Sequence, residues 1–284
     1  MKLLIKTTIF WMDIKIIKFI KKFIKNIFFS FNYIIIKQYY LDFDKDTSIK
    51  KILSYSKRNK KIIIFDVGAN IGQSVERFRK YLPSALIFSF EPNPDVFKIL
   101  NKRNDKKLKC FNVGLGLLNS NLLFYKQPDS GSGSFYKLKK NSDDFILSNT
   151  IEALKNTNKT TLKDNNIKFN TPIFVPVRTL KSIAKEHKIN YIDILKIDTQ
   201  GSEKKVLYGA GEILKKTLII ELEVIFANNY NNSTFGEMVN FLEKLNFVLW
   251  EIPYIGKFVT NKINRINSID VQFVNKKLLN KIST

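Results

Sequence analysis

Apolar runs alternate with amphipathic segments from about residue 61 onward. Short runs of Ile, Val, Leu and Phe, typical of buried strands, occur at 61–67, 85–90, 108–113, 191–197 and 217–222. Apolar residues recur at helical spacing in 71–81, 94–102, 179–187, 202–208 and 235–245. Because this alternation is typical of a mostly parallel sheet covered by helices on both faces, we predict a doubly wound α/β domain.

Three further segments complete this prediction. A short hairpin-type strand is expected at 121–125, and an antiparallel pair at 247–252 and 268–274 should close the sheet. Gly, Ser, Asn, Asp and Lys dominate 127–172, which predicts a long loop or lid with a short helix near 151–156. Its SGSGS run, Ser130–Ser134, is either a cover for an active site or a solvated flexible loop.

The first sixty residues form a separate, basic extension. They contain fourteen Lys or Arg against four acids, and lysines alternate with Ile and Phe at helical spacing between 13 and 29. Such an amphipathic helix either packs on the domain or a second subunit, or lies on an anionic membrane surface. The longest uncharged stretch, 26–36, is too short to span a bilayer, and no signal-peptide cleavage pattern follows it. We expect a cytoplasmic protein, with peripheral attachment to the inner face of the membrane as the alternative.

The numbers of Cys and His exclude more kinds of catalytic and metal site than the net charge does. The net charge of +23 suggests an anionic partner, but only six of the 48 basic residues are Arg, and abundant Lys, Asn, Ile and Phe are typical of an A/T-rich genome. A single Cys and a single His exclude an internal disulfide, a Cys/His zinc site and most catalytic triads. His187 is expected at a helix end and Cys110 in an apolar strand, so both favour structural roles.

One strand–turn–helix segment indicates a nucleoside ligand. In IIIFDVGANIG, a buried strand ends at Asp66 and continues through Gly68 and Gly72 into a helix. The glycine spacing does not match the dinucleotide fingerprint, so a different nucleoside ligand is favoured. Glu91 ends the next strand, nineteen residues after Gly72, where a carboxylate can accept hydrogen bonds from both ribose hydroxyls.

Five segments together carry a family resemblance: DVGANIGQS at Asp66–Ser74, FEPNPDVF at Phe90–Phe97, NVGLG at Asn112–Gly116, VRTLKSI at Val177–Ile183 and DILKIDTQGSEKKVLYGA at Asp193–Ala210. They resemble the FkbM-type family of S-adenosylmethionine-dependent methyltransferases, over about residues 61–250 of a predicted domain at 61–284. The resemblance implies a class I, Rossmann-like sheet. It also implies S-adenosylmethionine as the cofactor, bound by Asp66, Gly68, Asn70, Gly72, Glu91 and Asn112.

Candidate catalytic groups follow the fourth and fifth predicted strands of the sheet. Asp198 lies at the carboxyl end of one strand and Glu223 at the end of the next, so either could accept the proton of a substrate hydroxyl. Lys196 would orient the carboxylate or, alternatively, only neutralise Asp198 or Glu221 inside the sheet. A rival hypothesis is a magnesium site formed by Asp198, Glu221 and Glu223.

The predicted function is methyl transfer to a hydroxyl oxygen. The family resemblance implies sugars of cell-surface glycans, or secondary metabolites, as acceptors. Two alternatives stay open: a nucleic-acid methyltransferase, motivated by the net charge, and a non-catalytic, membrane-associated interaction protein with the same fold.

Overall fold

The computed structural model describes residues 45–55, 61–140, 142, 168–226, 235–259 and 264–279. The predicted helices at 13–29 and near 151–156 lie outside the described residues. Of two compact units, Tyr39–Gly256 with Ile266–Thr284 carries the sheet and the site; in the other, Met1–Gln38 with Lys257–Arg265, only strand residues 257–259 and 264–265 are described. No helix within the described ranges is long and apolar enough to span a membrane.

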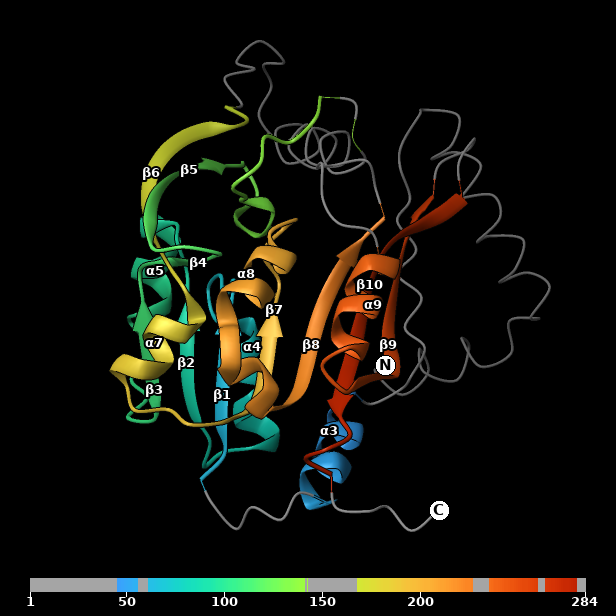
Figure 1. Cartoon of the computed structure of the whole chain (residues 1–284). Helices are drawn as coiled ribbons and strands as arrows, with labels where there is room; N and C mark the ends of the chain where they lie inside the picture. The colour runs from blue at the N-terminus through green and yellow to red at the C-terminus, as the bar shows by residue number, and fades with distance from the viewer. Residues whose placement is uncertain are drawn as a thin grey trace, which may run out of the picture. The chain divides into compact units, whose positions relative to one another are not determined.

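The core of the larger unit is a seven-stranded sheet in the order β3-β2-β1-β7-β8-β10-β9 (Figure 1). Its strands are β1 (Ile63–Val67), β2 (Leu86–Phe90), β3 (Leu108–Phe111), β7 (Ile192–Ile197), β8 (Thr217–Ile225), β9 (Phe247–Val259) and β10 (Asn264–Asn275). The pairs between β3, β2, β1, β7 and β8 are parallel, whereas β10 runs antiparallel to β8. This arrangement confirms the predicted class I, Rossmann-like sheet.

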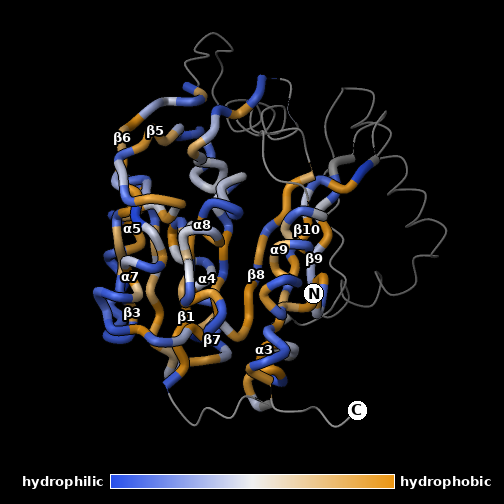
Figure 2. The backbone as a smooth tube through the Cα atoms, viewed as in Figure 1, coloured by the Kyte–Doolittle hydropathy of each residue, from blue (hydrophilic) through white to orange (hydrophobic). Residues whose placement is uncertain are grey.

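Helices cover both faces of the sheet, because strand side chains alternate between the two faces. On one face pack α7 (Leu180–Glu186), α8 (Glu203–Ala210), the 3₁₀ helix η3 (Gly211–Lys216) and α9 (Phe235–Glu243). On the other pack α3 (Lys45–Tyr55), α4 (Gln73–Tyr81) and α5 (Pro94–Leu100). Figure 2 shows the hydrophobic residues concentrated along the strands between these layers. The predicted doubly wound packing is therefore confirmed.

Helix α3 is an element that the sequence pattern did not predict. It lies inside the basic extension, yet Ile49 and Ile52 are almost fully buried in a cluster with Phe78 and Ile194. Burial of two Ile side chains stabilises the fold by about 3–6 kcal/mol. Residues 45–55 therefore pack as part of the sheet unit.

A second, three-stranded sheet has the order β4-β6-β5, with β4 (Gly114–Leu115), β5 (Ser120–Lys126) and β6 (Thr171–Arg178). Strand β6 was not predicted, because its sequence TPIFVPVR contains two prolines, which rarely occur in strands. They are tolerated because β4 pairs only with Val177 and Arg178, and no other described strand pairs with that edge of β6. Figure 1 shows this small sheet beyond the carboxyl ends of the parallel strands.

Candidate active site

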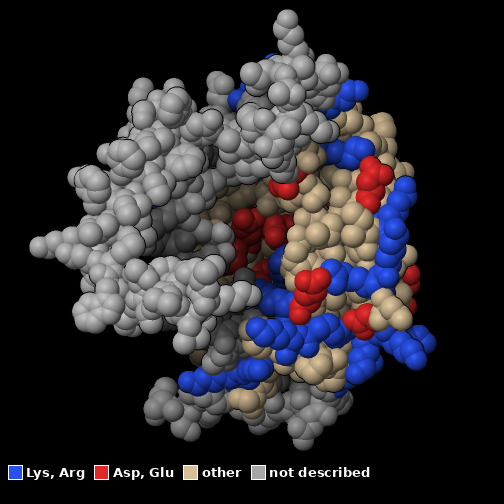
Figure 3. All heavy atoms as spheres, turned by 180° about the vertical axis from the view of Figure 1, so that it is seen from behind, with Lys and Arg blue, Asp and Glu red and all other residues tan. Residues whose placement is uncertain are grey.

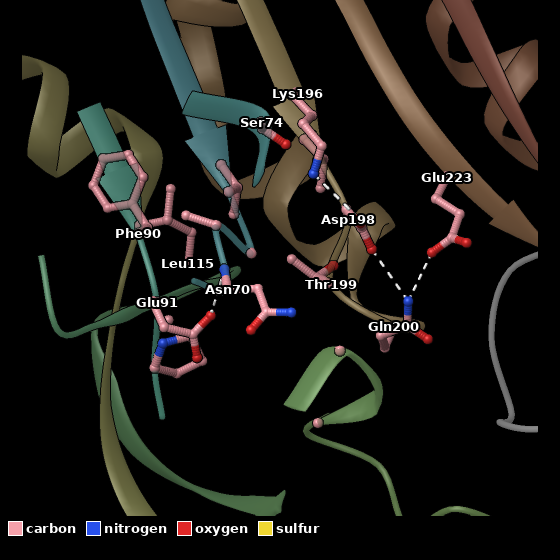
Figure 4. A pocket seen from close by; sticks show the side chains of 18 of the residues that line it. Asn70, Ser74, Phe90, Glu91, Leu115, Lys196, Asp198, Thr199, Gln200 and Glu223 are labelled. Atoms are coloured by element: carbon pink, nitrogen blue, oxygen red, sulfur yellow. Dashed lines mark hydrogen bonds and ion pairs between the residues drawn. The ribbon is translucent and has the colours of Figure 1, made fainter. Parts of the chain in front are cut away.

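A cavity of about 350 Å³ lies at the carboxyl ends of β1, β2, β7 and β8. Ligands of open α/β sheets bind at this edge, and the volume is within the range of small-molecule sites. Six of the predicted cofactor-binding and catalytic residues line it: Gly68, Asn70, Glu91, Lys196, Asp198 and Glu223. Glu221, a ligand in the magnesium hypothesis, lines it as well. Figure 4 shows the side chains of Asn70, Glu91, Lys196, Asp198 and Glu223 around the cavity.

The turn after β1 contains two backbone conformations that favour glycine. Gly68 has φ +79°, and a Cβ there would overlap the carbonyl oxygen of Asp198 in the neighbouring loop. Its N–H and that of Ala69 both donate to the carbonyl of Phe90 at 3.0 Å. Gly72, with φ +95°, is the N-cap residue of α4 and does not line the cavity. The turn thus brings its backbone against β7 and presents Asn70.

Glu91 is the acidic group at one end of the cavity. Its Oε2 accepts from the Asn70 N–H at 3.0 Å and its Oε1 from the Asn93 N–H at 2.8 Å. Burial raises the pKa of Glu91 to about 7, although these two N–H groups act in the opposite direction. Asn70 Oδ1 is buried and has no hydrogen-bond partner among the described residues, so this end of the cavity offers acceptor oxygens to a ligand.

Asn112 supports this end without entering the cavity. Its Nδ2 donates to the carbonyl of Glu91 at 2.8 Å and to that of Pro92 at 3.1 Å. The side chain therefore fixes the backbone turn that presents Glu91. Asn112 is not among the residues that line the cavity, and its contact with a cofactor stays a prediction.

Three charged residues on adjacent strands form what we call the inner row: Asp66 on β1, Lys196 on β7 and Glu221 on β8. They are direct cross-strand neighbours. Lys196 Nζ lies 3.7 Å from Asp66 Oδ1, and Arg77 of α4 reaches Glu221 at 2.7 Å. Asp66 is fully buried, burial raises its pKa, and it does not line the cavity. Two cations here face two carboxylates, so the inner row is electrically balanced.

The outer row consists of Asp198, just after β7, Glu223 on β8 and Asp270 on β10. Asp198 and Glu223 follow Lys196 and Glu221 of the inner row by two residues. Glu223 on β8 and Asp270 on β10 are cross-strand partners. Lys196 Nζ donates to Asp198 Oδ2 at 3.2 Å, which confirms the predicted ion pair with Asp198. The outer row thus has three carboxyl groups, and Lys196 contacts both Asp198 of this row and Asp66 of the inner row.

Gln200 bridges the first two members of the outer row. Its amide nitrogen donates to Asp198 Oδ1 at 3.1 Å and to Glu223 Oε2 at 2.7 Å, as the dashed lines in Figure 4 show. Glu203, at the start of α8, holds the turn before it by accepting from the N–H groups of Thr199 and Gly201. Gln200 received no role from the sequence, although it lies within the quoted segment Asp193–Ala210.

The two bridged carboxyl groups have opposite pKa shifts. Burial alone would raise the pKa of Asp198, but Lys196 and the hydrogen bonds to it outweigh burial and hold the pKa below its usual range. Burial raises the pKa of Glu223 well above its usual range, and the neighbouring charges of Asp198 and Asp270 raise it further. Glu223 is therefore the more basic of the pair when it is ionised.

The alternative magnesium site does not fit this geometry. No three Asp, Glu, His or Cys side chains in the described part of the chain are arranged to hold a metal ion. Glu221 is held by Arg77, and the amide nitrogen of Gln200 lies between Asp198 and Glu223. Because an amide N–H and a guanidinium occupy the oxygens that the ion would need, we derive no step through magnesium.

The SGSGS segment borders the cavity, which favours the first of its two interpretations. Ser130, Gly131 and Gly133 line the cavity, where 130–132 form the short 3₁₀ helix η2. Ser134 Oγ donates to the carbonyl of Gln200 at 2.7 Å and so ties this segment to the turn after β7. We infer that the segment forms one wall of the site.

His187 and Cys110 have the expected structural positions. His187 is the C-cap residue of α7, and its ring centroid lies 5.2 Å from that of Phe111 and 5.5 Å from that of Phe88. Cys110 is half-buried in β3, and burial raises the pKa of its thiol to about 11. Neither side chain lines the cavity.

Comparison with known proteins identifies the family of this chain. Residues 66–249 match the methyltransferase FkbM domain. The 2-O-methyltransferase NoeI of Sinorhizobium fredii (strain NBRC 101917 / NGR234) is 29% identical over 164 residues, which are 57% of this chain and 62% of that protein. The chain thus matches less than two thirds of that relative.

Two solved structures are examples of the structural matches to this chain. The precorrin-6y C5,15-methyltransferase of Geobacter metallireducens GS-15 gives a TM-score of 0.38 at 11% identity, covering 84% of this chain and 93% of that one. The METTL16 MTase domain gives 0.42 at 9% identity, covering 85% and 70%. Because these TM-scores and identities are low, the fold is assigned from the strand order of this structure. The family match covers well over half of the chain. The chain belongs to the FkbM family of methyltransferases.

Proposed function

We propose that this protein is an S-adenosylmethionine-dependent O-methyltransferase that modifies a hydroxyl group of a sugar in a cell-surface glycan or of a secondary metabolite. The family supports methyl transfer, and the relative named a 2-O-methyltransferase supports oxygen as the acceptor atom. The observation that carries the proposal is that one cavity contains Glu91 at one end and the bridged pair Asp198 and Glu223 at the other.

The Glu91 end fits the nucleoside part of S-adenosylmethionine. Glu91 would accept hydrogen bonds from the ribose hydroxyls, and the unpartnered Oδ1 of Asn70 would accept one from the amino-acid part. Gly68 keeps the backbone close. We assign Asp66, Gly72 and Asn112 supporting roles, because they shape this end without lining it. When bound, S-adenosylmethionine supplies an electrophilic methyl group on a sulfonium.

The Glu223 end would accept the proton. Forming the new O–CH₃ bond as the S–CH₃ bond breaks requires the acceptor oxygen to lose its proton. We assign Glu223 as the general base, because an ionised carboxylate of raised pKa is a stronger base than Asp198, which Lys196 stabilises in its ionised form. Glu223 then releases the proton to water. Asp198 and Lys196 would position Gln200 and, through it, Glu223.

Titration calorimetry of S-adenosylmethionine into the full chain tests the proposal directly. We expect Glu91→Gln to weaken binding by about tenfold, because a carboxylate that accepts hydroxyl hydrogen bonds is replaced by an amide. The matched control is Glu212→Gln in η3, since Glu212 is exposed and pairs only with the adjacent Lys215 among the contacts described. If the wild-type chain bound no S-adenosylmethionine, the enzyme proposal would fail and the non-catalytic alternative would replace it.

A further inference from the structure

A second, smaller cavity of about 220 Å³ adjoins the first. The two share Gly131, Gln200 and Glu223, so the proposed base forms part of the wall between them. The smaller cavity is otherwise lined by Asp129, Ser132, Ile225, Asn267 and Ser268. It therefore lies between the SGSGS segment and the adjacent ends of β8 and β10, next to the group that would take the proton.

The polar groups of this smaller cavity are mostly hydrogen-bond acceptors. Asn267 Oδ1 is buried and without a hydrogen-bond partner in the part of the chain that the structure describes. Asp129 and Glu223 add carboxylate oxygens, and Asp129 Oδ2 already accepts from Ser132 Oγ at 3.1 Å. Because a buried acceptor without a donor is costly, a ligand that supplies hydroxyl or ammonium hydrogens would be favoured here.

The charges around both cavities are predominantly negative, although the chain carries a net charge of +23. Among the described residues, carboxyl groups line the two cavities at Glu91, Asp129, Asp198, Glu221, Glu223 and Asp270. Cations line them at Arg77 and Lys196, which pair with Glu221 and with Asp66 and Asp198. Figure 3 shows acidic side chains inside a hollow, with Lys and Arg on the surface around it.

We propose that the smaller cavity is the acceptor subsite and that it selects a polyol without negative charge, either a neutral or an amino sugar unit, against sugar phosphates and uronates. The inference rests on the proposed methyl transfer and adds the substrate class. A hydroxyl of this sugar unit would reach Glu223 across the shared wall, while its remaining hydroxyl or amino groups donate to Asn267 and Asp129. An anionic group in the same place would face the carboxyl groups of the outer row, and charge repulsion would weaken its binding.

Matched sugar sets test the charge selection on the full chain. Release of S-adenosylhomocysteine is measured for glucose, glucosamine and glucuronate, and for galactose, galactosamine and galacturonate. In the set that is methylated, we expect the neutral or amino member to exceed the uronate by at least about tenfold in kcat/KM. Equal or higher turnover of the uronate would overturn the inference, and so would turnover of no neutral or amino member by a chain that binds S-adenosylmethionine.

A charge reversal in the subsite provides the second measurement. Asp129→Lys should move the preference toward the uronate by about fivefold or more, and Asp129→Asn by less. Glu212→Lys makes the same change of charge on exposed η3 and should leave the preference as it is. Calorimetry with S-adenosylmethionine on each variant separates the two proposals, because loss of binding would concern the methyltransferase function rather than acceptor selection. An equal shift in Asp129→Lys and Glu212→Lys would overturn the subsite.

Discussion

The two ends of the main cavity each carry a glutamate of raised pKa, but the surroundings of the two carboxyl groups differ. Burial, with smaller effects from the charges of Asp66 and Asp198, raises the pKa of Glu91, and two backbone N–H groups limit the rise to about 7. Glu223 is buried beside Asp198 and Asp270, whose charges raise its pKa further. The comparison shows how the same residue type suits two tasks: fixed donors suit hydrogen bonding to neutral hydroxyls, and neighbouring negative charge suits proton uptake.

The largest effect should come from removing the base at the Glu223 end. We expect Glu223→Gln to lower kcat by about 100-fold or more, the size of a lost general base, while the Kd for S-adenosylmethionine changes little. Single-turnover assays with a sugar that the enzyme accepts measure the rate of methyl transfer, and calorimetry measures the Kd for S-adenosylmethionine. Glu91→Gln should show the reverse pattern, with a larger effect on the Kd. Full turnover by Glu223→Gln would end the assignment and return the role of base to Asp198.

A smaller effect should follow from removing the bridge between the two carboxyl groups. Gln200 donates to both, so Gln200→Leu removes hydrogen bonds that favour their ionised forms. We expect the pKa of Glu223 to rise, the acidic limb of the kcat profile to move up by about one pH unit, and kcat near pH 7 to fall by about tenfold. A uniform loss of kcat at all pH values, with an unmoved profile, would indicate a purely structural role for Gln200.

The Glu91 end should respond to pH over a different range. Because its pKa of about 7 in the folded chain lies above the ordinary 4.5, Glu91 takes up a proton as the pH falls through 7 and then accepts fewer hydrogen bonds. We expect the affinity for S-adenosylmethionine to rise a few-fold, by about threefold to fivefold, between pH 6 and 8. Glu91→Gln should flatten this dependence. An equally steep dependence in Glu91→Gln would assign the titration to another group.

The raised pKa of Glu91 also makes the free energy of unfolding depend on pH. Between pH 4.5 and 7 the folded chain holds the Glu91 proton more tightly than the unfolded chain does. The contribution of this group to the free energy of unfolding therefore falls as the pH rises through that window. Chemical denaturation of the wild type and Glu91→Gln at pH 5 and 7.5 measures the difference, and the variant should lose less stability on going to the higher pH.

The smallest effect on catalysis should come from the basic extension. Deleting residues 1–44 removes the predicted amphipathic helix and leaves α3, whose Ile49 and Ile52 are buried in the core. We expect unchanged kcat on a soluble sugar and loss of binding to anionic vesicles, measured by co-sedimentation. Vesicle binding by the shortened chain would assign the membrane contact to the surface of residues 45–284. The comparison between the Glu91 and Glu223 ends of the cavity does not depend on this result.

The sequence by itself determined much of this fold, because strand and helix periodicities are local properties. It predicted the order of strands and helices along the chain, and it placed Glu91, Asp198 and Glu223 at the carboxyl ends of three strands. It did not reveal α3, whose apolar residues lie within a lysine-rich segment, or β6, whose two prolines are tolerated only because β4 is so short.

The tertiary structure decided what each of these residues touches. Strand pairing places Asp66 beside Lys196 in the inner row. The turn after β1, with Gly68 and Asn70 at positive φ, separates Asp66 from the residues that line the cavity. Strand pairing also brings Gln200 and Glu223, 23 positions apart in the sequence, to 2.7 Å, and Glu223 beside Asp270. Asp198 and Glu223 are both acidic residues at strand ends, so local sequence gives no reason for their pKa values to differ. The difference arises from burial and from charges on other strands, and these distances exist only once the sheet has formed.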